Sequence, residues 1–589
     1  MLLAETLTQV LIVWDRGLLQ NLSKTLLQDR IPIILLQIQN RTLIAQSATN
    51  AWGSGDSPEI TAYAILTLMA GHSLPWYAPL QEVALSSARS GQYFLDQFQS
   101  RWTEPSYVWI EKVPYGSATL SEAYCLAAMK VSVGSYQFSD RVKGLLAIPE
   151  EPPSKLVRFF STLPCFRDEP RWKMMAPAVE GLAFLPQLRA KGTDILPELS
   201  EAKNEYLAYI PFSWIAINYH RRVFLSTDLL WDMMILTICN FRVDEYMEST
   251  VAKLPNDQLE LTKQMIQELC SLNGLIALQR DAVSKRSDAA IHGNESFPKV
   301  DRGLGYLRSK GDDGHTSRAD EFFVDAYDRY SISTMTSVRV VLTHYIRTML
   351  NYPSVIGAST ADRSRYSNAL RTFLFSHITQ ISDNASFMTQ ISRVSSSTSI
   401  FTNPDQSFYQ WVHNTGGESV SCPFAFNFLT CLLGAASRQR PQKPTEDCFN
   451  STIHSYMAQE LCTHLAAMSR LYNDFGSVER DRLEANINSI NFPEFDERLH
   501  HVKSSTGTTT ARREQRPKKE LLALADFERQ NAEVASEKLL LVLETGAESG
   551  EPPTRKRKAD AVRLFVGVTT LYADLYVARD LSNRIETQR

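Results

Sequence analysis

Apolar residues recur along this chain at the three- and four-residue spacing of an α-helix, and this periodicity restricts the fold more than any other feature of the sequence. The runs Ala62–Met69, Met265–Leu272 and Leu461–Leu471 each place their apolar side chains on one helical face. No persuasive series of alternating apolar and polar residues, the pattern of half-buried strands, occurs. The sequence therefore predicts an all-α protein.

The composition narrows the class of protein. Hydrophobic residues make up 44% of the 589 positions, which is enough for more than one core, and the length suggests two to four domains. A net charge of −4 argues against nucleic acid as a main partner. The eight cysteines include no Cys-x-x-Cys pair, so we expect reduced core thiols without zinc or structural disulfides, as is typical of a cytoplasmic protein.

The sequence pattern predicts neither a signal peptide nor a membrane anchor. Glu5 lies early, and no basic leader followed by a clean apolar run begins the chain, so we expect no signal peptide. The apolar stretches 31–38 and 229–238 are too short or too interrupted to cross a bilayer. We therefore expect no transmembrane segment.

Four stretches interrupt the helical pattern. Residues 149–153 contain three prolines and end a helical segment. Residues 287–316, 504–519 and 546–558 are rich in polar residues or glycine, and we expect flexible insertions between helices there. The last of these ends in Arg555-Lys-Arg-Lys558, which would suit a nuclear address or contact with an acidic surface, although a solvated loop is the plainer interpretation.

One helical run carries a pattern that indicates chemistry. In Arg470-Leu-Tyr-Asn-Asp-Phe-Gly-Ser-Val-Glu-Arg-Asp481, the residues Asn473, Ser477 and Asp481 stand at i, i+4 and i+8, so their side chains form one stripe on a helix. Amide, hydroxyl and carboxylate oxygens are hard donors that suit Mg²⁺, which is usually bound jointly with substrate phosphates. Arg470 lies one turn earlier and can direct its guanidinium at the same phosphates. The stripe is typical of one half of a metal–diphosphate site.

The other half requires a second acidic helix face. Asp244 and Glu248 offer one in the apolar stretch 229–251, because they stand at i and i+4. Like charges at that spacing destabilise a helix by roughly 0.2–0.5 kcal/mol unless a cation lies between them.

Each pattern also has a plainer explanation. Asn473 can cap a helix, and Ser477 can bond to the preceding turn. Asp481 and Arg470 can belong to a solvated, charged surface.

Several uncommon segments carry a family resemblance. In chain order they are Ser57-Pro-Glu-Ile-Thr-Ala-Tyr-Ala64, Trp109-Ile-Glu-Lys-Val113, Leu120-Ser-Glu-Ala-Tyr-Cys125, Leu229-Leu-Trp-Asp-Met-Met234, Asp244-Glu-Tyr-Met-Glu248, Ser407-Phe-Tyr-Gln-Trp-Val412, Cys422-Pro-Phe-Ala-Phe426, the run 470–481 and Asn488-Ser-Ile-Asn-Phe-Pro-Glu-Phe495. Together they resemble fungal copalyl diphosphate/ent-kaurene synthase-type diterpene cyclases. The resemblance runs from about Trp52 to the C-terminus.

The resemblance implies a fold and a reaction. Residues 151–589 would form a class I terpene synthase α-helical bundle, preceded in residues 1–150 by a partial α-barrel, the remnant of a class II β domain. In the class I site, Mg²⁺ ions bridge two motifs and draw diphosphate off an allylic substrate. Carried over residue by residue, the first metal motif falls on Asp244 and Glu248 with Glu245 beside them, the second on Asn473, Ser477 and Asp481, and the diphosphate-binding arginine on Arg470.

Two departures from the family pattern stand out. Asp481 occupies a position that is often Glu, and the shorter arm shifts the oxygen by about one C–C bond, which matters because Mg²⁺ geometry is demanding. The segment 287–316 lengthens the separation between the two motifs.

The family's class II site, which protonates geranylgeranyl diphosphate through an Asp-x-Asp-Asp motif, has no counterpart in the sequence. The nearest string, Asp312-Asp313, has Lys310 in place of the first Asp. We expect the chain to begin after the position of that motif, and we expect no protonation-initiated cyclisation from this chain alone.

The favoured hypothesis is a Mg²⁺-dependent class I diterpene synthase, a carbon–oxygen lyase that converts copalyl diphosphate to a kaurene- or pimarane-type diterpene. A separate class II cyclase could supply that substrate. Two alternatives stay open: a class I cyclase that acts directly on geranylgeranyl diphosphate, and a non-catalytic remnant. Aromatic side chains could line a cavity for a carbocation, although core packing is the commoner role for each. The candidates are Phe212, Trp214, Tyr246, Phe408, Tyr409, Trp411 and Phe424.

Overall fold

The computed structural model confirms the predicted all-α class. It describes the chain except for residues 20, 21, 24, 73, 77, 111, 112, 133, 135, 147, 149, 150, 197–205, 272–318, 394–399, 437–445, 485, 497–509, 547–551 and 579–589. Among the described residues, the strands are confined to one antiparallel ribbon of β1 (Val108–Ile110) and β2 (Val113–Tyr115), in which Val108 pairs with Tyr115.

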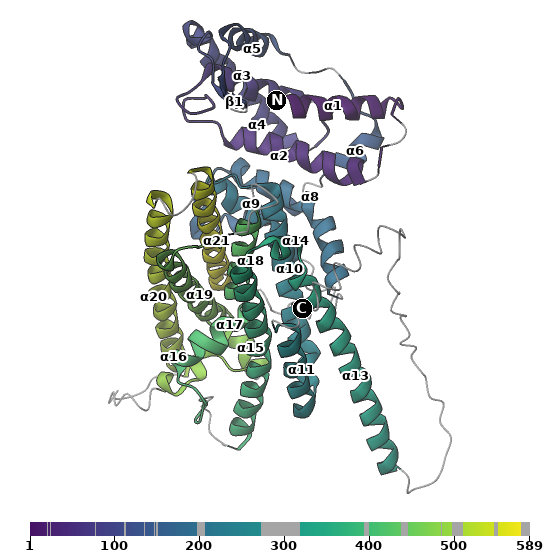
Figure 1. The fold of residues 1–589 in the computed structure, drawn as a ribbon, viewed down its shortest axis with the longest axis vertical. Coiled ribbons are helices and arrows are strands. Elements are labelled where there is room, and N and C mark those ends of the chain that lie inside the picture. Colours follow the sequence, from purple (N-terminus) through teal and green to yellow (C-terminus); the bar gives the residue numbers. More distant parts are fainter. Residues whose placement is uncertain are drawn as a thin grey trace.

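Two groups of helices follow each other along the chain (Figure 1). The N-terminal helices lie together at the top of the view and are α1 (Leu2–Asp15), α2 (Ile31–Ile44), α3 (Pro58–His72), α4 (Ala78–Gln97), α5 (Ala118–Lys130) and α6 (Asp140–Leu146). The following helices are α7 (Glu151–Phe160), α8 (Arg171–Ile195), α9 (Tyr209–His220), α10 (Thr227–Ser249), α11 (Asn256–Leu269), α13 (Ala319–Leu350), α14 (Pro353–Gly357), α15 (Thr360–Arg393), α16 (Phe408–Trp411), α17 (Gly417–Ser419), α18 (Cys422–Ala436), α19 (Thr452–Glu484), α20 (Thr510–Thr545) and α21 (Pro552–Ala578).

Helix α19 shows how the apolar spacing becomes packing. Its buried residues include Ala458, Leu461, Leu465 and Met468, which recur every three or four positions and so lie on one face. Helix α19 packs against α18, α20 and α21, and the other long helices contribute to the same hydrophobic core. The helices are held together by the hydrophobic effect, which contributes a free energy of about 25 cal/mol for each Å² of apolar surface that is buried.

One hydrophobic cluster extends from Ile33 in α2 to Leu575 in α21, while a smaller cluster joins α1, α2 and α6. The N-terminal helices also bond to the rest through a buried carboxylate, Glu180 of α8. Gln37 and Asn40 of α2 donate to its oxygens over 2.8 and 3.3 Å, and the Tyr219 hydroxyl donates to it from α9. Burial raises the pKa of Glu180. The division at residue 150 stays a prediction.

Two of the predicted insertions are partly wrong. Helix α20 begins at Thr510, within the segment 504–519, and α21 begins at Pro552, within 546–558. The basic tetrad thus belongs to the first turns of α21 rather than to a solvated loop. Charged side chains that suggested a loop instead pair along the helices, since Lys556 lies 2.9 Å from Asp560 and Arg516 lies 2.9 Å from Glu520. Residues 287–316 lie outside the described residues.

Helix α21 is apolar enough that length and composition alone would allow residues 553–578 to cross a membrane. The prediction of no transmembrane segment did not take this stretch into account. Within the structure, however, 61% of its apolar window is buried, and the helix contacts α9, α18, α19 and α20. Its composition is therefore explained by its position in the core.

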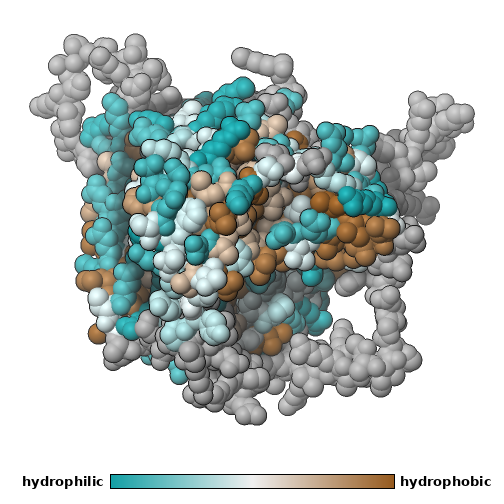
Figure 2. All heavy atoms as spheres, turned by 90° about the horizontal axis from the view of Figure 1, so that it is seen from above, coloured by the Kyte–Doolittle hydropathy of each residue, from teal (hydrophilic) through white to brown (hydrophobic). Residues whose placement is uncertain are grey.

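Apolar side chains reach the surface of the N-terminal helices. In the view down onto these helices, hydrophobic groups lie among polar ones (Figure 2). Leu2 and Leu3 of α1 and the nearby Leu18 are exposed. The cysteines agree with the prediction of core thiols, because all eight are free and all except the partly buried Cys165 are buried.

A glycine in α19 provides a test of how tightly α19 and α21 pack. A Cβ at Gly476 would lie 2.3 Å from the carbonyl oxygen of Tyr576, so G476A must push the helices apart. We expect a loss of about 1–3 kcal/mol in the free energy of unfolding, measured by chemical denaturation. The matched control is G144A in α6, where a Cβ meets nothing within 4 Å. It should be neutral or stabilising by about 0.5–1 kcal/mol, and equal effects of the two substitutions would contradict the close packing.

Candidate active site

A cavity of about 610 Å³ lies among the helices of the second group. Its walls come from α9, α10, α15, α18, α19 and α21, together with the residues just after α19. The volume is within the range of about 300–1,000 Å³ that is usual for small-molecule sites. Polar side chains from α10, α15 and α19 share this cavity with aromatic and aliphatic ones.

Helix α10 contributes the first predicted acidic face. Asn240, Asp244 and Glu248 line the cavity at i, i+4 and i+8, which is one stripe of the helix. The Asp244 side chain is 47% exposed, so its carboxylate can meet a ligand. Glu245 is buried and is not part of the cavity wall.

Helix α19 contributes the second predicted face. Arg470, Asn473 and Asp481 line the cavity, so the carboxylates of Asp244 and Asp481 share one cavity as the sequence predicted. Ser477 is buried one turn before Asp481 and donates its hydroxyl to that carboxylate over 2.6 Å. The structure therefore brings together the two motifs, which lie more than 200 residues apart in the sequence.

The plainer explanations of the stripe do not hold. Asn473 lies in the middle of α19 rather than at a cap, and the Ser477 hydroxyl bonds to Asp481 rather than to the preceding turn. Asp481 and Arg470 are both buried, so neither belongs to a solvated surface.

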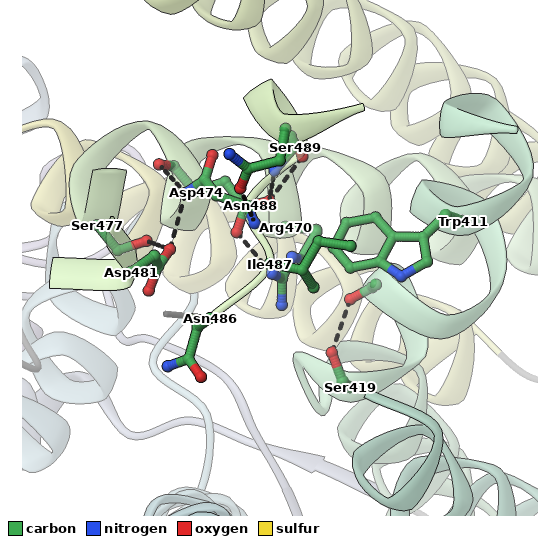
Figure 3. A network of polar contacts seen from close by, with 12 residues as sticks. Trp411, Ser419, Arg470, Asp474, Ser477, Asp481, Asn486, Ile487, Asn488 and Ser489 are labelled. Atoms are coloured by element: carbon green, nitrogen blue, oxygen red, sulfur yellow. Dashed lines mark hydrogen bonds and ion pairs between the residues drawn. The ribbon is translucent and has the colours of Figure 1, made fainter. Parts of the chain in front are cut away.

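The guanidinium of Arg470 is held from two sides (Figure 3). Its Nη2 lies 2.8 Å from Oδ1 of Asp474, one turn later on α19, and its Cζ lies 4.7 Å from the centre of the Trp411 ring. Both partners are buried, and burial raises the pKa of Asp474, which the nearby Arg470 counteracts. The indole face and the carboxylate fix the cation beside the cavity.

The carboxylate of Asp481 already accepts several protein donors. Arg480 lies 3.1 Å from Oδ1, while Ser477 and Asn488 donate to Oδ2 over 2.6 and 2.7 Å. Arg480 also lines the cavity. A second guanidinium therefore stands next to the second motif.

A buried histidine faces the first motif. His377 of α15 lines the cavity, and its Nε2 lies 3.4 Å from Oδ1 of Asp244 without a hydrogen-bond partner of good geometry. Burial lowers the pKa of His377 to about 4; the nearby Glu248 acts in the opposite direction, and Arg470 acts in the same direction as burial. The imidazole is therefore neutral at physiological pH.

Of the aromatic side chains proposed for the lining, only Trp214 is among the residues that form the cavity wall. Phe212 packs 4.1 Å from Phe160, Phe424 stacks on Phe373, and Tyr409 is exposed. Tyr246, Phe408 and Trp411 also pack elsewhere. The aromatic lining comes instead from residues that were not predicted: Tyr206, Tyr209, Phe241, Phe373, Phe565, Tyr572 and Tyr576.

The donor set on the two walls is suited to Mg²⁺. Carboxylate, amide and hydroxyl oxygens of the two motifs face the cavity or border it, and such hard donors suit Mg²⁺. Across the described part of the chain, no three side chains of the His, Cys, Asp and Glu types converge into a ready-made metal site.

Sequence reasoning missed the groups that support the motifs. His377 and Asn488 act on the predicted residues from other parts of the fold, whereas Asp474 and Arg480 act on them from α19 itself. The only sequence signal for Asn488 was its place in a segment that carries the family resemblance. For His377 the sequence offered none.

Comparison with known proteins finds several curated relatives over nearly the whole chain. Pimaradiene synthase pbcA of Emericella nidulans is 32% identical over 98% of this chain, and ent-kaur-16-ene synthase of Fusarium fujikuroi is 29% identical over 100% of it. Phyllocladan-16-alpha-ol synthase of Phomopsis amygdali is 27% identical over 99%. The aligned parts are 54% to 55% of these relatives, so the chain spans about half their length. No protein-family model and no solved structure matches the chain.

The low pKa of His377 predicts a pH dependence of stability. Because the folded pKa of about 4 lies below the unfolded value of about 6.5, the unfolded state binds the proton more readily between these values. The wild type should therefore lose stability as the pH falls from 6.5 to 4, by on the order of 2 kcal/mol at pH 5 relative to pH 7. Denaturant unfolding at both pH values should show a smaller loss for H377Q.

The exposed His344 of α13 supplies the control, since H344Q should keep the wild-type pH dependence. The same loss in H377Q as in the wild type would show that His377 is not held in the neutral form.

Proposed function

Because the chain belongs to the fungal diterpene synthase family that includes pimaradiene and ent-kaurene synthases, we propose that it is a Mg²⁺-dependent class I diterpene synthase. Its substrate is copalyl diphosphate, and its product is a diterpene of the kaurene or pimarane type. The observation that carries this proposal is the placement of Asp244, Glu248, Arg470, Asn473 and Asp481 around one cavity.

The reaction begins with heterolysis of the allylic C–O bond. The electron pair leaves with the diphosphate, and an allylic carbocation remains in the cavity. Arg470 neutralises part of the charge that develops on the leaving group, in a setting where burial strengthens electrostatic interactions. Arg480, which also lines the cavity, can add to this stabilisation.

Magnesium would be held by Asp244 and Glu248 on α10 and by Asn473, Ser477 and Asp481 on α19. When bound, it supplies a Lewis acid that stabilises the departing diphosphate and orients it. The short arm of Asp481 is compensated on the protein side, because Ser477 and Asn488 fix one of its oxygens.

The rest of the cavity suits a hydrocarbon cation. Tyr209, Phe241, Phe373 and Phe565 present aromatic rings to it, and a ring face stabilises a desolvated cation by up to about 2 kcal/mol. The apolar walls exclude water until ring closure ends. A C–H proton is then lost to form the alkene, and we propose that the released diphosphate accepts this proton.

The assignment of copalyl diphosphate as the substrate is part of this proposal. The 589 residues carry no Asp-x-Asp-Asp motif, so we propose that the protonation that makes copalyl diphosphate takes place outside them, for example in a separate class II cyclase. We place the enzyme in the cytoplasm, where both prenyl diphosphates would reach it from solution.

Substrate feeding tests this function. The purified chain is incubated separately with copalyl diphosphate stereoisomers and with geranylgeranyl diphosphate, with and without Mg²⁺, and the extracted volatiles are analysed by gas chromatography and mass spectrometry. We expect a C₂₀ product from one copalyl isomer only, and none after chelation of Mg²⁺. A product from geranylgeranyl diphosphate alone would favour direct cyclisation. A folded helical protein that releases no diphosphate from any substrate would favour the non-catalytic remnant.

Charge removal on α10 tests the role of the first motif. Asp244→Asn keeps the shape of the side chain but weakens the proposed metal site, and we expect kcat/KM to fall about 100-fold or more. Asp228→Asn is the matched control, because Asp228 lies exposed in the first turn of the same helix. Equal rates for D244N and the wild type would contradict the assignment of Asp244.

A further inference from the structure

The residues that follow α19 turn back and close one side of the cavity. Asn486 and Ile487 form part of the cavity wall. Asn384 of α15 binds both of them, since its amide nitrogen donates to Oδ1 of Asn486 and its amide oxygen accepts from the main-chain nitrogen of Ile487, each over 2.9 Å. We call residues 486–489 the strap, because they bond to both α15 and α19 beside the cavity.

The next residue of the strap is Asn488. Both ends of its carboxamide form hydrogen bonds, the nitrogen with α19 and the oxygen within its own turn. Its Nδ2 donates to the main-chain oxygen of Asp474 over 2.9 Å and to Oδ2 of Asp481 over 2.7 Å. Its Oδ1 accepts from the main-chain nitrogen of Ile490. Asn488 is 2% exposed, so water cannot readily replace these donors.

Ser489 supports the guanidinium of Arg470 on α19 indirectly, through Asp474 (Figure 3). Its main-chain nitrogen and hydroxyl donate to Oδ2 of Asp474 over 3.0 and 2.6 Å, and the other oxygen of Asp474 lies 2.8 Å from Arg470. The strap therefore bonds directly to the carboxylate of Asp481. It also bonds to the carboxylate of Asp474, which pairs with Arg470.

From this arrangement we infer that Asn488 is a positioning residue that sets the carboxylate of Asp481 for binding of a divalent cation. The inference rests on the proposed function, in which Asp481 is a metal ligand. Two short bonds to Oδ2, one from Ser477 on α19 and one from Asn488 on the strap, fix the plane of the carboxylate. Oxygens held in this way bind a metal without a prior reorganisation, and loss of such supporting bonds usually weakens metal affinity by about 10–100-fold.

The test measures cation affinity directly, apart from turnover. Mn²⁺ is titrated into the full chain in the presence of inorganic diphosphate, and bound Mn²⁺ is followed by electron paramagnetic resonance. Asn488→Ala and Asn488→Leu both remove the donors, and Leu preserves most of the bulk. We expect both variants to bind Mn²⁺ about 10-fold more weakly than the wild type, and the Mg²⁺ concentration for half-maximal turnover should rise in parallel.

Asn427 gives a matched control. Its Nδ2 also donates to a main-chain oxygen, that of Pro423 over 2.8 Å, but it does not line the cavity. N427A and N427L should stay within about twofold of wild-type Mn²⁺ affinity, a shift far below the expected tenfold effect. Thermal unfolding of all four variants shows whether each is folded.

Folded N488A and N488L with wild-type Mn²⁺ affinity would overturn the inference. Failure of both to fold, while the Asn427 variants fold, would also overturn it, because Asn488 would then be a structural residue. The proposed function fails separately: a wild-type chain that binds Mn²⁺ with diphosphate yet forms no terpene would refute the reaction and leave the role of Asn488 intact. A wild type that binds no Mn²⁺ with diphosphate would overturn both.

Discussion

The burial of a guanidinium beside an apolar cavity is the constraint on which the site depends. A charge taken from water costs several kcal/mol unless it is paired, and removal of one partner of a buried pair is strongly destabilising. Arg470 meets this demand with Asp474 at 2.8 Å and with the face of Trp411 at 4.7 Å. Gly416 leaves room for the Trp411 ring in this arrangement, because a Cβ at Gly416 would lie 3.0 Å from the ring. The carboxylate lies on the same helix as Arg470, whereas the indole and the glycine come from residues 411–416, so the cation is held from both sides only when these segments have packed together.

The rest of the site is organised around that cation. Helices α10 and α19 bring oxygen donors to a shared cavity. Aromatic rings from α9, α10, α15 and α21 line the same cavity. An ionised diphosphate and a hydrocarbon cation need these two environments side by side. The strap 486–489 and the buried His377 border the polar part, and both derive from the packing of α15 against its neighbours.

Local features of the site could be read from the sequence, whereas tertiary features could not. Helical spacing predicts that Asn473, Ser477 and Asp481 share a stripe, and the structure confirms it because periodicity is a property of one helix. The partners of that stripe, such as Asn488 and His377, depend on which segments meet in space. The prediction of the aromatic lining was largely wrong for a similar reason. A Phe or Tyr side chain packs equally well in a core or in a cavity wall, so the residue type does not reveal where the side chain points. The starts of α20 and α21 were missed because their charged residues form ion pairs along the helix. Composition alone does not reveal this stabilisation of the helix.

A crystal structure of the chain soaked with Mg²⁺ and inorganic diphosphate would test the central claim most directly. If α10 and α19 form one metal–diphosphate site, the electron density will show diphosphate beside Arg470, with metal ions contacted by oxygens of Asp244 on one side and Asp481 on the other. Diphosphate bound at a different surface, or metal contacted by only one of these two helices, would contradict the claim that the two motifs act together.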